Sequence, residues 1–161
     1  MTEDVSRRGF LKTAGIAVAA GAITGTAAQT QEPPATGRKI RIIGLACSPR
    51  KGKTTAAAVQ VALEAAAKVS PNVETELIEL AGMNIPVFDP VNPNKGDFTS
   101  LEPKLADAAV AGFIIGTPVY FSGMSSLCKA FIDQCMVFRK NNFALKHKVA
   151  GVVAVGGVRN G

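Results

Sequence analysis

The order of the apolar segments constrains the fold of this chain more than any other feature. Short runs rich in β-branched residues alternate with helix-forming segments from Lys39 onward. Ile40–Ala46 is such a run, and the Ala-rich segment 54–69 follows it after a short polar loop. Continuous apolar runs of this length are typical of buried parallel strands. Strands that alternate with helices predict an open parallel α/β sheet with right-handed crossovers and helices on both faces.

The rest of the chain continues this alternation. We expect strands at 73–80, 110–117 and 148–155, and helices at 100–109 (capped by Thr99 or Ser100) and 122–138. Residues 81–98 hold three prolines, two glycines and three asparagines, and are expected to form a loop. Ligands of such sheets bind outside the carboxyl ends of the strands. Three loops leave those ends, at residues 47–55, 118–124 and 156–161.

Composition limits the chain to one globular domain. It has 161 residues, of which 47% are hydrophobic, enough for one core and too few for two. The net charge of +6 is spread along the chain, without the interleaved aromatic and basic residues of a nucleic-acid reader. We therefore expect no nucleic-acid partner, and a basic surface that suits anionic ligands. The sole histidine, His147, is interpreted as a surface residue.

The three cysteines form no C-x-x-C pair, which argues against a zinc site and a disulfide framework. Cys128 and Cys135 fall on one expected helix. Their seven-residue separation places them about 10 Å apart, too far to bridge while the helix is intact. We interpret Cys47, Cys128 and Cys135 as small buried hydrophobic residues.

The N-terminus resembles a twin-arginine export signal. The matching residues are Ser6, Arg7, Arg8, Gly9, Phe10, Leu11 and Lys12. A mild apolar stretch and the small residues Thr26, Ala27 and Ala28 follow, so we expect a signal peptide at 1–28, a Pro-rich linker at 29–38 and a domain at 39–161. The resemblance implies export of a folded protein by the twin-arginine machinery to the periplasm or another extracytoplasmic site, often with a cofactor already bound.

The loop at residues 47–55 has the features of a phosphate site. It leaves a strand and enters a helix, whose first N–H groups and positive dipole end attract anions. Hydroxyl and basic side chains add further donors: Ser48, Thr54, Thr55, Arg50, Lys51 and Lys53. A Walker A loop is the alternative, because Gly52-Lys53-Thr54 matches its ending. That motif needs a glycine where Cys47 stands, and Pro49 removes an N–H from the cradle, so nucleotide hydrolysis is not expected.

Residues 47–55 instead resemble the G-S-P-R-K-x-x-x-T phosphate loop of the NADPH-dependent FMN reductase family, in the flavodoxin-like superfamily. Cys47 replaces the family's first glycine. Three further segments resemble the family in the right order: residues 116–121 (G-T-P-V-Y-F), 129–133 (K-A-F-I-D) and 156–161 (G-G-V-R-N-G). The resemblance extends over residues 39–161.

This resemblance implies the residues that bind FMN. Ser48, Arg50 and Thr55 would hold the phosphate, with Lys53 and Thr54 as looser candidates. The flavin ring would lie along Pro118, Val119, Tyr120, Phe121 and Ser122, and its other side would be closed by Gly156, Gly157 and Arg159. No constellation of acid and base catalysts is present, as expected where the flavin carries the hydride.

The implied activity is transfer of hydride from NADPH or NADH through FMN to a flavin, quinone or similar acceptor, by a homo-oligomer. Two alternatives stay open: an electron carrier with a protein partner, and a remnant that binds no flavin.

Related iron-sulfur flavoproteins place cysteines in the loop after the second strand, but residues 81–98 have none, so no metal cluster is expected. A flavodoxin-like sheet has five strands, usually ordered 2-1-3-4-5. We count four, and expect that the chain is a piece of a longer reading frame with an exposed fourth strand.

Overall fold

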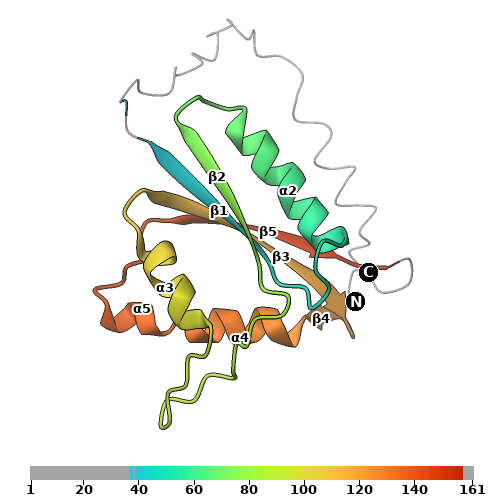
Figure 1. The fold of residues 1–161 in the computed structure, drawn as a ribbon, viewed down its shortest axis with the longest axis vertical. Coiled ribbons are helices and arrows are strands. Elements are labelled where there is room, and N and C mark those ends of the chain that lie inside the picture. Colours follow the sequence, from blue (N-terminus) through green and yellow to red (C-terminus); the bar gives the residue numbers. More distant parts are fainter. Residues whose placement is uncertain (1–36, 38, 158–161) are drawn as a thin grey trace, which may run out of the picture. The chain divides into compact units, whose positions relative to one another are not determined.

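The computed structural model describes residue 37 and residues 39–157 (Figure 1). The expected signal peptide and Arg159 lie outside the described residues. Along the chain the elements are β1 (Ile40–Ala46), α2 (Thr54–Ala67), β2 (Val73–Glu79), α3 (Phe98–Ala106), β3 (Val110–Tyr120), β4 (Gly123–Met124), α4 (Ser126–Gln134), α5 (Val137–Lys140) and β5 (Val149–Val155).

The long strands form a parallel sheet in the order β2-β1-β3-β5. Gly44 pairs with Leu77 of β2 and with Ile114 of β3, and Gly116 of β3 pairs with Val153 of β5. The two-residue β4 pairs antiparallel with the end of β3. This order is the one expected for the first four strands of a flavodoxin-like sheet, so the predicted fold class is confirmed.

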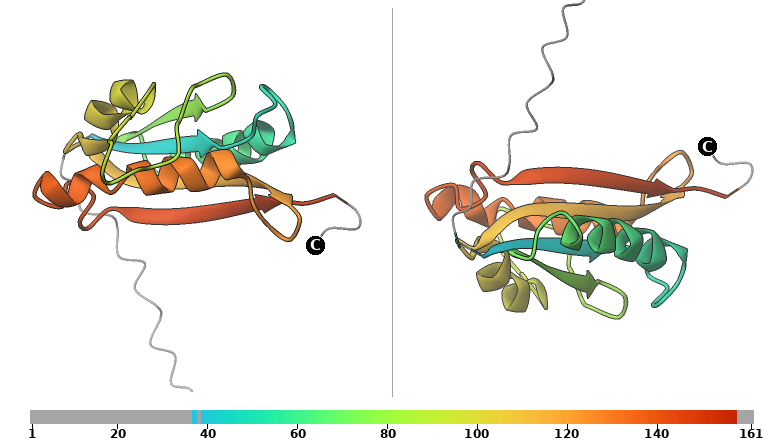
Figure 2. Two further views of the ribbon diagram at one scale, coloured as in Figure 1. Left: turned by 90° about the horizontal axis from the view of Figure 1, so that it is seen from below. Right: turned by 90° about the horizontal axis from the view of Figure 1, so that it is seen from above.

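Helices cover both faces of this sheet, with α2 on one side and α3, α4 and α5 on the other (Figure 2). Glycines let α2 approach closely: a Cβ atom built on Gly44 or Gly116 would lie 2.6 or 2.3 Å from Val59 of α2. On the opposite face, Phe98 of α3 packs its ring 5.7 Å from Phe131 and 6.2 Å from Phe138. Helix α2 is therefore fixed directly over β1 and β3, whose ends carry the first two loops.

Strand β5 is the exposed edge of the described sheet. Val149 and Val152, whose side chains point to opposite faces, are both 74% exposed. Its start is held by Lys148, whose ammonium donates to the carbonyl oxygens of Asp107 (2.8 Å) and Val110 (2.6 Å). The expectation of an uncovered apolar strand is confirmed for the described residues.

Four of the expected elements have bounds that differ from the prediction by two residues or more, and α3, predicted at 100–109, also ends earlier, at Ala106. Residues 122–138 are not one helix: Ser122 lies in the β3–β4 turn, α4 begins at Ser126, and α5 follows as a separate turn. Strand β3 extends through Pro118 and Tyr120 because β4 pairs with its end. Helix α3 begins at Phe98, after Asp97, whose side chain accepts from the Asn84 N–H instead of capping the helix. Helix α2 ends at Ala67.

The described helices are also too short or too polar to cross a lipid bilayer.

Candidate functional site

The loop after β1, the β3–β4 hairpin and the end of β5 lie at the same end of the sheet (Figure 2). Hydrogen bonds join the first two: the Cys47 N–H donates to the Gly116 carbonyl at 2.8 Å. The register of β3 and β5 pairs Pro118 with Val155, which places Gly156 beside the hairpin. The parallel topology thus brings together the three loops that the sequence predicts as the walls of one site.

Two residues of the loop at 47–55 that carry hydroxyl groups are buried. The side chains of Ser48 and Thr55 are each only 3% exposed, whereas Arg50, Lys51 and Lys53 are exposed. The Ser48 hydroxyl accepts the Arg50 N–H at 3.1 Å, which leaves the hydroxyl proton for another acceptor. Gly52 has φ 63°, a left-handed conformation that glycine adopts without strain.

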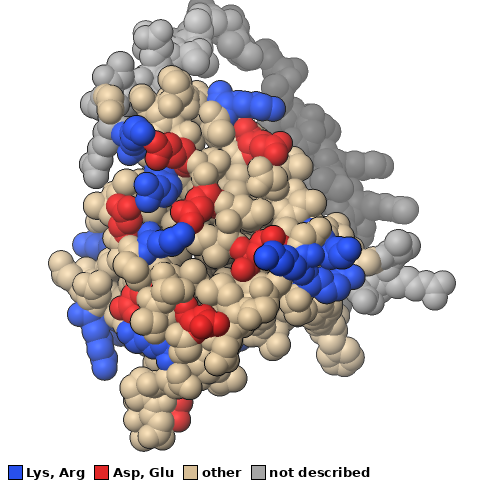
Figure 3. Space-filling model, viewed as in Figure 1, with Lys and Arg blue, Asp and Glu red and all other residues tan. Residues whose placement is uncertain are grey.

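The start of α2 is open to an anion. Lys53 is the N-cap residue, makes no side-chain capping bond, and is followed by no acidic residue in the first turn. The first bond at this end runs from the Ala57 N–H to the Lys53 carbonyl, so the amides of the preceding turn point outward. Basic side chains gather over this loop, with an acidic group beside them (Figure 3). Uncapped amides, a helix dipole and nearby cations together form an anion-binding end.

A carboxylate of the chain itself already contacts this loop. Glu79, the last residue of β2, accepts the Gly52 N–H at 2.6 Å. The Gly52 N–H is thus hydrogen-bonded to a negatively charged oxygen. This is the kind of acceptor expected for the amides of an anion-binding loop. The sequence analysis missed Glu79, because only the pairing of β2 with β1 brings the end of β2 to the loop.

The second wall is a tight hairpin. Phe121 and Ser122 occupy its two-residue turn with φ 47° and 62°, a left-handed conformation that is costly for a phenylalanine. Phe121 is fully exposed, and Tyr120 and Met124 are about half exposed, at 46% and 48%. The hairpin therefore presents apolar side chains to solvent at the carboxyl end of the sheet. Side chains in this position can cover a planar ligand that binds there.

A buried hydrogen-bond network fixes this hairpin to the first loop. Ser125 caps α4: its hydroxyl accepts the Cys128 N–H at 3.1 Å and donates to the Cys47 carbonyl at 2.7 Å. The Ser125 N–H in turn donates to the Thr117 hydroxyl at 3.0 Å. Neither Ser125 nor Thr117 was among the predicted site residues, although Thr117 belongs to the 116–121 segment that resembles the family. A serine followed by an apolar helical run is a capping signal, but the helix was predicted to begin at Ser122, which placed Ser125 inside it.

The sequence model of NADPH-dependent FMN reductase matches residues 40–161, three quarters of the chain. The chain belongs to this family. Curated relatives of the FMN reductase domain include an iron-sulfur flavoprotein of Methanocaldococcus jannaschii, 36% identical over 130 residues, and one of Methanosarcina thermophila, 30% identical over 128 residues. Each alignment covers 76% of this chain, and 65% and 66% of the respective relative. The chain thus spans about two thirds of the length of these relatives.

Solved structures share the fold of this FMN reductase family member. An NADH:FMN oxidoreductase in its apo form superimposes with a TM-score of 0.57 and 26% identity, covering 75% of this chain and 60% of that one. RosB, solved with a bound riboflavin-phosphate intermediate, superimposes with a TM-score of 0.56 over 75% of this chain and 54% of its own. At 16% identity, RosB supports the fold alone.

The structure brings together most of the residues that the family resemblance implies. Ser48 and Thr55 are buried in the first loop, and Arg50, Lys53 and Thr54 lie exposed around them. In the second wall Pro118 is buried, Val119 is half-buried, and Tyr120, Phe121 and Ser122 are exposed. Gly156 and Gly157 are exposed after β5. Their role in binding stays a prediction.

Metal ligands do not cluster in this FMN reductase domain as described. Within residues 39–157, no group of three or more His, Cys, Asp or Glu side chains is arranged to hold a metal ion. The loop between β2 and α3 has no cysteine.

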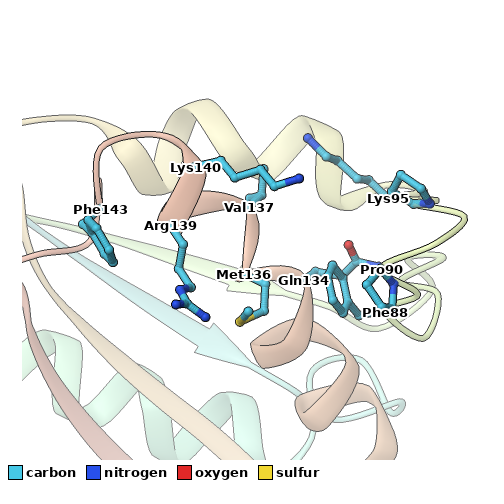
Figure 4. A pocket seen from close by; sticks show the side chains of 10 residues that line it. Phe88, Pro90, Lys95, Gln134, Met136, Val137, Arg139, Lys140 and Phe143 are labelled. Carbon is cyan, nitrogen blue, oxygen red and sulfur yellow. The ribbon is translucent and has the colours of Figure 1, made fainter.

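A separate cavity of about 640 Å³ lies between that loop and the turn from α4 to α5 (Figure 4). Phe88, Met136 and Phe143 line it, with Arg139 and Lys140 at its rim. It contains none of the predicted site residues. Gln134 closes its inner side: this amide is 3% exposed and donates from Nε2 to the carbonyls of Pro86 and Asn94, both at 2.9 Å.

Proposed function

We propose that the chain binds FMN with its phosphate at the start of α2. The observation that carries this proposal is the uncapped N-terminus of α2, opened by a loop with two buried hydroxyls and three basic residues. Ser48, Arg50 and Thr55 hold the phosphate, with Lys53 and Thr54 beside them. Membership of the FMN reductase family and the resemblance to an NADH:FMN oxidoreductase support the same ligand.

The flavin ring, in this proposal, lies along the hairpin from Pro118 to Ser122. Tyr120 packs beside it, and the backbone there offers N–H and C=O groups to the polar edge of the ring. Gly156 and Gly157 close the other side; Arg159, which the family resemblance adds to this wall, lies outside the described residues. Bound FMN supplies hydride transfer, which the chain's own side chains do not provide. The protein's contribution is to bind the flavin, orient the donor and leave one ring face open.

We further propose that the protein is an exported oxidoreductase that takes hydride from NADPH or NADH and passes it to a flavin, a quinone or a similar small acceptor, as a homo-oligomer. The residues Arg7 and Arg8 within the N-terminal motif support export. A carrier that exchanges electrons with a protein partner is the second candidate. The basic net charge of +6 disfavours it, since an acidic surface is the pattern expected of such a carrier.

One experiment separates these proposals. The full chain is expressed in a bacterium, and the periplasmic and cytoplasmic fractions are compared. We expect yellow protein in the periplasmic fraction, whose flavin absorbance bleaches anaerobically with NADPH or NADH. Yellow protein that neither donor bleaches would establish the carrier, and protein that remains colourless with added FMN would refute flavin binding. Protein found only in the cytoplasm would refute export alone.

The Glu79 carboxylate is expected to weaken binding of a phosphate at the same loop, because the two anions repel. Glu79→Gln keeps an oxygen that can accept the Gly52 N–H but removes the charge. We expect FMN to bind about twofold to fivefold more tightly to this variant, on the scale of a partly exposed charge pair. Fluorescence titration of FMN measures the dissociation constant.

Glu76→Gln is the matched control, since Glu76 lies on the same strand but pairs with Lys104 at 2.5 Å. Weaker FMN binding in Glu79→Gln would mean that the carboxylate mainly holds Gly52 in position.

A further inference from the structure

Two thiols far apart in the sequence meet beneath the phosphate loop. Cys47 follows β1 and Cys128 lies in the first turn of α4, and their side chains are 0% and 2% exposed. They belong to one cluster of buried residues, and each thiol is the largest influence on the pKa of the other. The prediction that all three cysteines are buried is confirmed for Cys47 and Cys128, whereas Cys135 is only half-buried, and the proximity of Cys47 to Cys128 was not predicted.

The backbones of the two cysteines are held in this arrangement by one hydroxyl. Ser125 Oγ donates to the Cys47 carbonyl and accepts the Cys128 N–H, at 2.7 and 3.1 Å. Ser125 is itself fixed to Thr117 of β3. A disulfide requires Cα atoms within about 7 Å of each other. Ser125 bridges the backbones of these two buried cysteines, and this bridge is the proximity on which we base a disulfide between them.

The two thiols differ in acidity because their surroundings shift their pKa values in opposite directions. The hydrogen bond from Cys47 lowers the pKa of the Cys128 thiol to about 7 and outweighs its burial, with a further contribution from Thr117. Cys128 is also the third residue of α4 after its cap, at the positive end of the helix dipole. The same contact, with burial, raises the pKa of Cys47 far above its usual range. Cys128 is therefore the nucleophile and Cys47 the proton-bearing partner.

Cys135 is excluded from the pair. It ends α4 as the C-cap residue, its thiol donates to the Phe131 carbonyl at 3.4 Å, and burial raises its pKa to about 12. It is a third thiol on the same helix, and it serves as an internal control.

We propose that Cys47 and Cys128 form a redox-active dithiol that a hydroperoxide oxidises to a disulfide between the phosphate loop and α4. The Cys128 thiolate attacks one peroxide oxygen, the O–O bond breaks, and Cys128 becomes a sulfenic acid; the departing hydroxide or alkoxide takes up the proton that the Cys128 thiol had released and leaves as water or an alcohol. The Cys47 sulfur then attacks the Cys128 sulfur, the S–O bond breaks, and the hydroxyl leaves with the Cys47 proton as water. The two thiols lose two electrons and the peroxide gains them.

The test treats the native full chain with hydrogen peroxide and then maps its peptides without reduction. Trypsin cuts after Lys129, so the three cysteines fall in separate peptides, at residues 42–50, 105–129 and 130–139. We expect a linked pair of 42–50 with 105–129, a mass lower by two hydrogen atoms, and a fall from three titratable thiols to one. A link that includes 130–139, or three thiols retained after a dose that oxidises the urea-unfolded chain, would overturn the proposal.

Two cysteine variants test which thiols form the pair and which of them is oxidised first. Cys135→Ala keeps the pair and is expected to fall from two titratable thiols to none. Cys47→Ala removes the partner, so Cys128 is expected to stop at a sulfenic acid that dimedone traps. Circular dichroism before oxidation checks that each variant is folded. Equal dimedone labelling of Cys128 in the wild-type chain and in Cys47→Ala would show that Cys47 does not resolve the sulfenic acid, and would refute the pair.

Discussion

Replacing Thr55 by valine is expected to weaken FMN binding by about tenfold to a hundredfold while the fold stays intact. Thr55 is the second residue of α2, it is 3% exposed, and its hydroxyl accepts or donates no hydrogen bond within the described residues, so it is available to a ligand at the start of the helix. Valine has nearly the same shape and fills the same space. A hydrogen bond to a charged group contributes about 1.5–3 kcal/mol, which corresponds to this loss of affinity.

The measurement is a fluorescence titration of FMN with the purified full chain, beside a urea unfolding curve. Thr75→Val is the matched control, because Thr75 is an exposed residue of β2 and the same hydroxyl is removed there. We expect the control to bind FMN as the wild type does. An unchanged dissociation constant for Thr55→Val would mean that the phosphate binds away from the start of α2.

The second large effect is expected at Gly116. Its alanine variant would place a methyl group 2.3 Å from Cγ2 of Val59 and 3.2 Å from Cγ2 of Thr55. The neighbours belong to α2, which packs rigidly on the sheet, so helix and strand must separate or distort. Overpacking of this kind costs about 1–3 kcal/mol of the free energy of unfolding. Because Thr55 is one of the displaced residues, FMN affinity is expected to fall as well.

Urea denaturation of the variant measures this cost. Gly151→Ala is the control: on β5 the nearest atom to its new methyl group is the Phe113 carbonyl oxygen, at 4.0 Å. We expect the double variant Gly116→Ala, Val59→Ala to lose less stability than the sum of its single changes, since the smaller side chain makes room for the methyl group. Equal stability of Gly116→Ala and Gly151→Ala would contradict close packing of α2 against β3.

The parts of the fold that were predictable are those fixed by local patterns. Ile40–Ala46 is a continuous apolar run because a parallel strand is covered on both faces, and its predicted bounds are those of β1. The Ala-rich α2 was equally clear. The β3–β4 hairpin was not, because its turn uses Phe121 and Ser122 in the left-handed region, where a hairpin usually has Asn-Gly. Pairing with Gly123 stabilises a turn that the local sequence does not indicate.

The site shows the same division. Ser48, Arg50 and Thr55 could be found because one loop and its helix contain them all. Glu79, Ser125 and the contact of Cys47 with Cys128 could not, since each depends on tertiary contacts between elements distant in the chain. Sequence patterns therefore identify the hydroxyl and basic residues of the phosphate loop. They do not identify the Glu79 carboxylate, which contacts the same loop, or the Ser125 hydroxyl, which connects this loop to α4.

The loop between β2 and α3 is closed at its neck by hydrogen bonds that involve none of the three loops of the candidate site. The Asn84 and Asp97 backbones are bonded at 2.9 Å, and the amide of Gln134 holds Pro86 and Asn94 one step farther out. Residues 87–93 lie beyond that neck and protrude from the domain (Figure 1), and Val87 and Val91 there are 82% and 80% exposed. A segment anchored in this way can be lengthened, shortened or given new side chains with little strain on the sheet. The domain therefore has a second position, apart from the three loops of its candidate site, at which changes of sequence are expected to leave the sheet intact.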